Sequence, residues 1–142
     1  MAHYLPRTKA FIAAAHCPLP DSIRQERTRV KHGHGPRYRN LSYYDVESDT
    51  IWLTPTDWKS RFVFFHECGH VYDRHHLSDT DREYLRHLLG YPRRPWFWGK
   101  WNPLKHFVEP VEEKFADAYA RCCMNPTRQR RLRWFLAARK RG

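Results

Sequence analysis

The chain has 142 residues with a formal net charge of +11; 41% of its residues are hydrophobic and 15% are aromatic. This length suits a single domain over residues 1–142, and the apolar content is enough for one compact core. No apolar run approaches the roughly 20 residues that a membrane-crossing helix needs, so we expect no membrane partner.

Residues 6–15 predict a helix that ends before the proline-rich stretch at residues 17–20. Its apolar run of about six residues is short for a signal peptide, so we interpret it as a cytosolic amphipathic helix. The cysteines lack CxxC spacing, which predicts reduced, mostly buried thiols: Cys17, Cys68, Cys122 and Cys123. We therefore expect a cytoplasmic protein, in the host cytoplasm if a phage encodes it.

Residues 21–40 are basic and poorly patterned, and the glycines and proline around His32 and His34 predict a loop. These two histidines suit a flexible surface segment better than a metal site. The segments Asn40–Val46 and Thr50–Leu53 alternate in polarity and predict an antiparallel hairpin.

The segment from Phe62 to Asp73 holds His66 and His70 directly behind an apolar run. On a helix, residues four apart lie on one face, so both imidazoles can bind one ion. Glu67 would then hold its carboxylate beside the metal, where a general base can act on a metal-bound water. Zinc would lower the pKa of that water to roughly 7 and polarise a scissile carbonyl.

Two other features of this helix bear on the prediction. Thr56 and Asp57 are candidates to cap its start. Histidines in a buried helix can also be core residues satisfied by hydrogen bonds, so a third ligand elsewhere in the chain is needed to favour the metal site.

The first candidate for a third ligand is Glu113, in a segment that reads as a helix opened by Pro110. Glu113 and Asp117 are four residues apart and share a face. If Glu113 binds zinc, Asp117 can accept a hydrogen bond from the outer nitrogen of a metal-bound histidine. Glu112 has an alanine at the same offset, which favours Glu113. Three alanines keep this helix slim enough to lie close to its partner: Ala116, Ala118 and Ala120.

The second candidate is His76, which lies ten residues after His66. Metzincin peptidases place their third histidine at this distance, with a glycine where the chain turns out of the helix. This chain has Asp73 at that position, and Asp adopts the left-handed conformation less readily than glycine. We favour Glu113 and keep His76 as the alternative third ligand.

The motif His-Glu-Cys-Gly-His at residues 66–70, followed 43 residues after His70 by Glu-Lys-Phe-Ala-Asp at residues 113–117, resembles the gluzincin peptidases. The chain is most similar to the small ImmA/IrrE-like metallopeptidases of phages and mobile elements and to the minimal gluzincins, over about residues 38–122. The resemblance implies one Zn²⁺ per chain, with these roles: His66, His70 and Glu113 as metal ligands, Glu67 as general base, and Asp117 as the partner of His66.

The second half of the chain adds two helices and a connector. Ser78 to Asp81 predict a helix start, and this helix would end at Gly90. The connector at residues 91–101 interleaves aromatic with basic residues, and its tryptophans suit packing in the core: Trp96, Trp98 and Trp101. A basic helix over about residues 127–141, capped by Thr127, carries seven positive charges and no acid.

One hairpin followed by helical patterns, with no βαβ alternation, predicts an α+β fold. We expect a small antiparallel sheet packed on the helix of His66 and on the helix of Glu113, which is a zincin-like arrangement. An edge strand beside the metal can bind an extended peptide by backbone pairing.

Two functional hypotheses follow. The first is a zinc-dependent metalloendopeptidase that hydrolyses peptide bonds in a protein substrate. The second is a basic nucleic-acid-binding or regulatory module with a structural or inactive zinc site. A pI near 9.9 permits a nucleic-acid partner, which would contact the C-terminal helix and the aromatic connector. The sequence does not identify the residue that would stabilise the oxyanion. Three residues are candidates by their chemical type alone: His106, Tyr91 and Tyr119.

Overall fold

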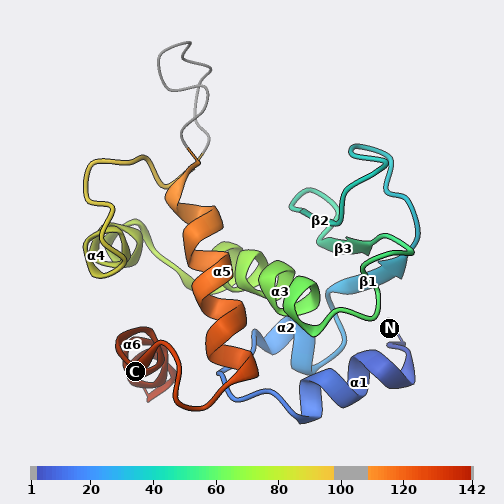
Figure 1. Ribbon diagram of the computed structural model, residues 1–142, viewed down its shortest axis with the longest axis horizontal. Coiled ribbons are helices and arrows are strands. Elements are labelled where there is room, and N and C mark those ends of the chain that lie inside the picture. The colour runs from blue at the N-terminus through green and yellow to red at the C-terminus, as the bar shows by residue number, and fades with distance from the viewer. Residues whose placement is uncertain (1–2, 98–108, 142) are drawn as a thin grey trace.

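The computed structural model describes residues 3–97 and 109–141 and has an α+β architecture (Figure 1). Within these residues the chain forms six helices and three strands, in the order α1 (Pro6–Ala13), α2 (Asp21–Arg24), β1 (Arg29–His32), β2 (Tyr43–Asp45), β3 (Thr50–Leu53), α3 (Arg61–His76), α4 (Asp79–Leu88), α5 (Val111–Met124) and α6 (Arg130–Arg141). Helix α3 runs through the middle of the molecule, with the sheet on one side and α4 and α6 on the other. None of the described helices has the length and hydropathy needed to cross a bilayer.

The sheet contains the predicted hairpin, but it also has a third strand that was not predicted. Strands β2 and β3 pair antiparallel, with Tyr43 opposite Trp52 and Asp45 opposite Thr50. Strand β1 pairs with the other edge of β3 in parallel, so the sheet is mixed, with the order β1-β3-β2, and is not purely antiparallel as expected. Strand β1 was not predicted from the basic stretch. It has only four residues, which alternate between exposed and half-buried positions, and so short a pattern does not distinguish a strand from a loop.

Helices α3 and α5 pack together at the centre of the core. Phe64, Phe65 and Val71 on α3 and Phe115 and Tyr119 on α5 are at most 1% exposed. Small residues permit the close approach, because the backbone of Ala116 on α5 lies directly against Gly69 on α3. The close approach expected of the alanines on α5 is therefore confirmed at Ala116, where the two backbones meet.

The helix starts differ in part from the predictions. Helix α3 begins at Arg61, and its cap is Ser60, whose Oγ accepts a hydrogen bond from the Val63 backbone N–H at 3.2 Å. Asp57 caps nothing; it accepts hydrogen bonds from the hydroxyls of Ser42 and Thr54 and ties β2 to the segment that follows β3.

The other two predicted caps had different outcomes. Ser78 and Asp81 form the predicted capping box at the start of α4. The last helix begins at Arg130, three residues later than predicted, because Thr127 is held in a turn by the Asn125 side chain.

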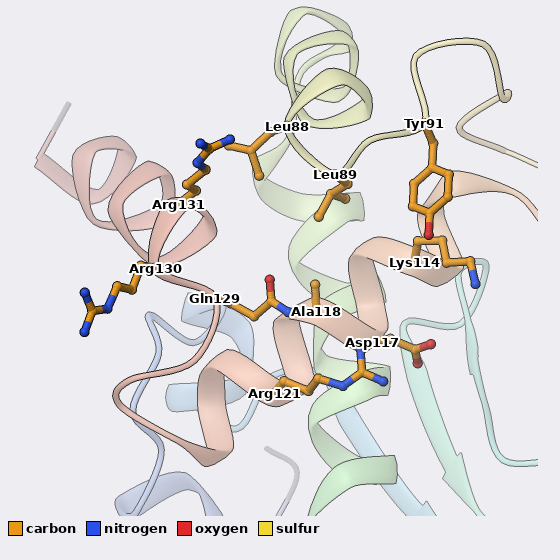
Figure 2. Close-up of a pocket in the computed structure, with 10 residues that line it drawn as sticks. All are labelled: Leu88, Leu89, Tyr91, Lys114, Asp117, Ala118, Arg121, Gln129, Arg130 and Arg131. Atoms are coloured by element: carbon orange, nitrogen blue, oxygen red, sulfur yellow. The ribbon is translucent and has the colours of Figure 1, made fainter.

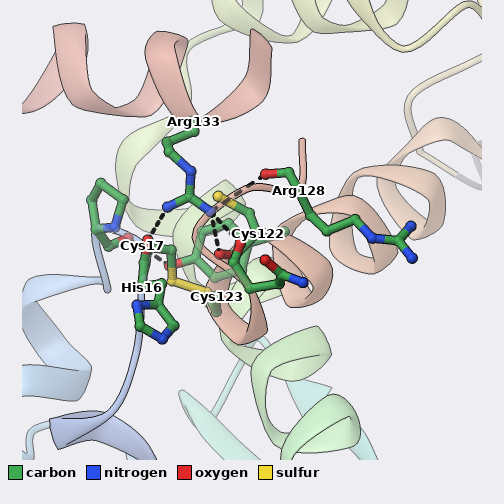
Figure 3. Close-up of a disulfide and its surroundings, with 9 residues drawn as sticks. His16, Cys17, Cys122, Cys123, Arg128 and Arg133 are labelled. Atoms are coloured by element: carbon green, nitrogen blue, oxygen red, sulfur yellow. Dashed lines mark hydrogen bonds between the residues drawn. A yellow bond between two sulfur atoms is a disulfide. The ribbon is translucent and has the colours of Figure 1, made fainter. Parts of the chain in front are cut away.

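A disulfide between Cys17 and Cys123 ties the segment after α1 to the end of α5 (Figure 3). Their Cα atoms are 4.4 Å apart, although 106 residues separate them in the chain. The prediction that all cysteines are reduced was therefore wrong for this pair, whereas Cys68 and Cys122 are free and buried. The cytoplasmic location was inferred from reduced cysteines, whereas disulfides are typical of oxidising compartments. The cytoplasmic location therefore remains a prediction.

The same corner of the molecule is held by Arg133 of α6. Its guanidinium donates hydrogen bonds to the backbone carbonyls of His16, Cys122 and Asn125. Figure 3 shows the Arg133 side chain beside the disulfide. These carbonyls lie at or near the C-terminal end of α5, where a positive charge is favourable. The cation and the disulfide thus fasten the end of the helix that carries Glu113.

Candidate metal centre

Helix α3 and helix α5 bring three ligand-type side chains to one point. His66 Nε2 lies 3.1 Å from one carboxylate oxygen of Glu113, and His70 Nε2 lies 3.1 Å from the other. One ligand atom from each of the three residues lies within 4.8 Å of the other two, so this group can hold a metal ion.

The spacing of these atoms fits zinc. Ligand atoms about 2.1 Å from a tetrahedral zinc lie roughly 3.4 Å from one another, close to the separations found between Glu113 and the two histidines. The donor set of two imidazoles and one carboxylate also matches the three protein ligands of catalytic zinc sites. By contrast, a structural zinc site normally has four protein ligands, and three gather here among the described residues.

Asp117 lies behind His66, one turn after Glu113 on α5. Its Oδ1 is 2.8 Å from His66 Nδ1, so this nitrogen carries a hydrogen and donates it to the carboxylate. With Nδ1 engaged by Asp117, Nε2 is the nitrogen of His66 that faces Glu113 and could bind a metal ion. The four-residue spacing of Glu113 and Asp117 thus lets both carboxylates contact His66 from one face of α5.

The charges of the group are strongly coupled. Burial alone would lower the pKa of His70, but its hydrogen bond to Glu113 and the nearby Glu67 raise that pKa to about 9. Burial would raise the pKa of Glu113, but the hydrogen bonds from His66 and His70 hold it well below its usual value. Glu113 is therefore an anion at neutral pH, which is the state in which a carboxylate binds a cation.

Glu67 is next to the ligand group but does not belong to it. Its side chain is only 5% exposed, and burial raises its pKa to about 7. It has no side-chain hydrogen bond to the described residues around it and lines the same cleft as the two histidines. A buried carboxylate with a pKa near neutrality can accept and release a proton, as a general base must.

The cleft in front of this group has a volume of about 910 Å³. One wall is the hairpin side, with Ser42, Tyr43 and Tyr44, and another is the start of α5, with Glu112 and Glu113. Strand β2 is an edge strand, since within the described sheet it pairs only with β3. A cleft of this size, bordered by an edge strand, can accommodate an extended peptide segment.

The structure keeps His76 away from the ligand group. Helix α3 continues without a break through His76, which accepts a hydrogen bond from the Asp21 backbone N–H at 3.4 Å. Ten residues of helix place it about 15 Å along the axis from His66.

The helix continues past Asp73 because of the contacts that Asp73 makes. Its carboxylate is buried and accepts hydrogen bonds from Arg82 at 2.7 Å and from the indole N–H of Trp96 at 2.9 Å. This position therefore anchors α4 and the connector instead of turning the chain toward the metal group. Trp96 lies in the core, as expected, whereas Trp98 and Trp101 are outside the described residues.

Neither described candidate for oxyanion stabilisation lines the cleft of the metal group. Tyr119 is fully buried, and its hydroxyl donates to the Pro18 carbonyl, so it does not face the cleft. Tyr91 lines a separate pocket beyond α5, and His106 is outside the described residues. The sequence patterns did not indicate Arg74, which lines the cleft. Its position four residues after His70 could have revealed it, because that spacing places it on the metal-facing side of α3.

Comparisons of the chain with protein-family models, with curated proteins and with solved structures gave no match. The function is therefore inferred from the residues of this chain and their geometry.

Proposed function

We propose that this protein is a zinc-dependent metalloendopeptidase of the gluzincin type. The observation that carries the proposal is the convergence of His66, His70 and Glu113 beside an uncoordinated, buried Glu67 in an open cleft. A structural metal site has no use for a carboxylate that stands next to the ligands without binding.

In the proposed reaction, these three side chains would hold zinc, which would supply the Lewis acidity to polarise the scissile carbonyl and activate water. Glu67 accepts a proton from the attacking water and passes it to the leaving amine. Asp117 keeps His66 in one tautomer and orientation. Arg74, which lines the cleft one turn after His70 on α3, is the proposed cation to stabilise negative charge that develops on the substrate.

The proposed substrate is an extended segment of a protein. Such a segment can add to the free edge of β2 by backbone hydrogen bonds, which select for an extended conformation and read little sequence. Charges of both signs line the cleft, among them the cations Arg37 and Arg74 and the carboxylates Glu109 and Glu112. We therefore expect a preference for polar, flexible segments over folded ones.

Substitution of Glu67→Gln tests the proposal, because it keeps the shape of the side chain and removes the base. We expect zinc content to stay near one per chain while hydrolysis of an unstructured protein falls by roughly 100-fold or more. Zinc is measured by mass spectrometry of the metal, and cleavage by mass spectrometry of the products.

The matched control is Glu47→Gln, an exposed carboxylate in the turn between β2 and β3, which should change neither quantity. Equal cleavage by Glu67→Gln and the parent would contradict the proposed mechanism. Full zinc binding without cleavage of any member of a broad peptide library would favour the alternative, a binding module with an inactive site.

A further inference from the structure

A second pocket has a volume of about 420 Å³ and shares no lining residue with the cleft in front of the metal group (Figure 2). Helices α4 and α5 and the start of α6 enclose it. Its charged lining consists of Lys114, Arg121, Arg130 and Arg131 with one carboxylate, Asp117, and this carboxylate is engaged with His66. The pocket therefore has an excess of positive charge.

The arginines of α6 whose side chains are described divide into two groups. Arg133 caps the end of α5, and Arg139 pairs with Asp81 at 2.7 Å, so both have structural roles. Arg130 and Arg131 are exposed and form no ion pair with any described residue. Arg121 of α5 likewise has no acidic partner in the described part of the chain, although its guanidinium lies 5.8 Å from the Phe62 ring. Three cations at this pocket are thus available to a ligand.

An exposed aromatic ring follows two of these cations on α6. Trp134 is 70% exposed and lies three and four residues after Arg131 and Arg130, so the three side chains share one side of α6. Single exposed apolar residues are common on protein surfaces, so the ring gains significance only from the two arginines on the same side of α6. An aromatic ring interleaved with cations is a combination found on surfaces that bind single-stranded nucleic acid. We refer to Arg121, Arg130, Arg131 and Trp134 as the α6 surface.

The packing of α6 excludes a membrane as the partner of this surface. A basic helix binds a bilayer by inserting its apolar face. In α6 the apolar face is already packed against the rest of the protein. Leu132 and Leu136 are fully buried, and the ring of Phe135 stacks on the ring of Tyr84 of α4, with 5.3 Å between the ring centroids.

We propose that the α6 surface binds single-stranded nucleic acid. Guanidinium groups bind phosphates through paired N–H donors, and the pocket between α4, α5 and α6 holds several of them around an apolar floor of Leu88, Leu89 and Ala118. The face of Trp134 can stack on a base, and a base is accessible for stacking only when the strand is unpaired. An acidic peptide would satisfy the cations but would leave the indole without a partner. The proposal does not depend on the peptidase activity, since no residue of the α6 surface belongs to the metal group.

The test uses the full-length protein and a fluorescein-labelled 12-nucleotide oligothymidine, with fluorescence anisotropy as the readout. If three phosphates are contacted, the affinity should fall about 20-fold between 50 and 200 mM salt. Arg130→Gln/Arg131→Gln should weaken binding by at least about 10-fold and flatten the salt dependence. Trp134→Ala should weaken it by roughly 10-fold with little change in the salt dependence, because stacking is not ionic.

The matched control is Arg27→Gln/Arg29→Gln, which removes the same charge from two exposed arginines at and before β1. In Figure 1, strand β1 lies on the opposite side of α3 from α6. An equal loss of affinity in this control would show attraction by net charge alone and would overturn the proposal. Equal binding of a polyglutamate peptide or of a duplex of the same length would overturn it as well, and so would an unchanged affinity in Trp134→Ala.

Discussion

Gly69 of α3 lies so close to Ala116 of α5 that a Cβ atom at position 69 would come within 2.9 Å of the Ala116 Cα. The obstacle is backbone, which cannot move aside as the end of a side chain can. This contact sets the spacing between the helix that carries the two histidines and the helix that carries Glu113.

Gly69→Ala should therefore destabilise the protein, although alanine is the better helix former. The gain in helix propensity is about 1 kcal/mol, whereas overpacking of a core typically costs about 1–3 kcal/mol. We expect a fall in the unfolding midpoint in urea together with weaker zinc binding. An unfolding midpoint at or above that of the parent would show that the two helices do not depend on this contact.

Glu113→Ala should remove zinc. Loss of one of three protein ligands lowers metal affinity heavily, because the remaining two imidazoles cannot complete the site. The measurement is competition with a chromophoric chelator. Two controls separate the ligand from its neighbourhood: Glu112→Ala removes the adjacent carboxylate of the same cleft, and His76→Ala removes the alternative ligand. Both should retain zinc, and loss of zinc in His76→Ala with retention in Glu113→Ala would reverse the assignment.

Asp117→Ala should reduce zinc affinity or activity by about 10- to 100-fold, a smaller effect than that of Glu113→Ala. The reason is that His66 keeps its ligand nitrogen but loses the carboxylate that orients its ring at 2.8 Å. Asp117→Asn keeps an acceptor oxygen and should give an intermediate loss. If Asp117→Ala bound zinc as tightly as the parent, the hydrogen bond would have no part in organising the metal group.

Replacement of both disulfide cysteines, Cys17→Ser/Cys123→Ser, should lower the free energy of unfolding by about 2–4 kcal/mol, because the cross-link closes a long loop. The parent protein in reducing agent should match this variant in urea denaturation. An independent check is the number of thiols that react in denatured, unreduced protein. Two are expected, from Cys68 and Cys122, and four would contradict the disulfide.

Features that depend on local spacing could be predicted from the sequence. The placement of His66 and His70 on one helical face follows from their four-residue separation, and the same rule pairs Glu113 with Asp117. The capping box of Ser78 and Asp81 is equally local, since it involves neighbouring backbone groups within one turn.

Features that depend on contacts between distant segments could not be predicted from the sequence. The parallel pairing of β1 with β3 requires strands about twenty residues apart to meet, and nothing in the residues of β1 specifies its partner. The Cys17–Cys123 pairing spans 106 residues, and its sulfur atoms meet only because α5 ends beside the segment after α1. No motif marks such a pair.

The sequence by itself determined the donor types and their spacing on each of two helices, because helical periodicity is a local property of the backbone. It offered two candidates for the third ligand, Glu113 and His76. Only the tertiary structure decided which of them meets the histidine pair. Arg82 and Trp96 hold Asp73 within a continuous α3, so His76 is carried away from the pair, while the close contact of Gly69 with Ala116 brings Glu113 to it.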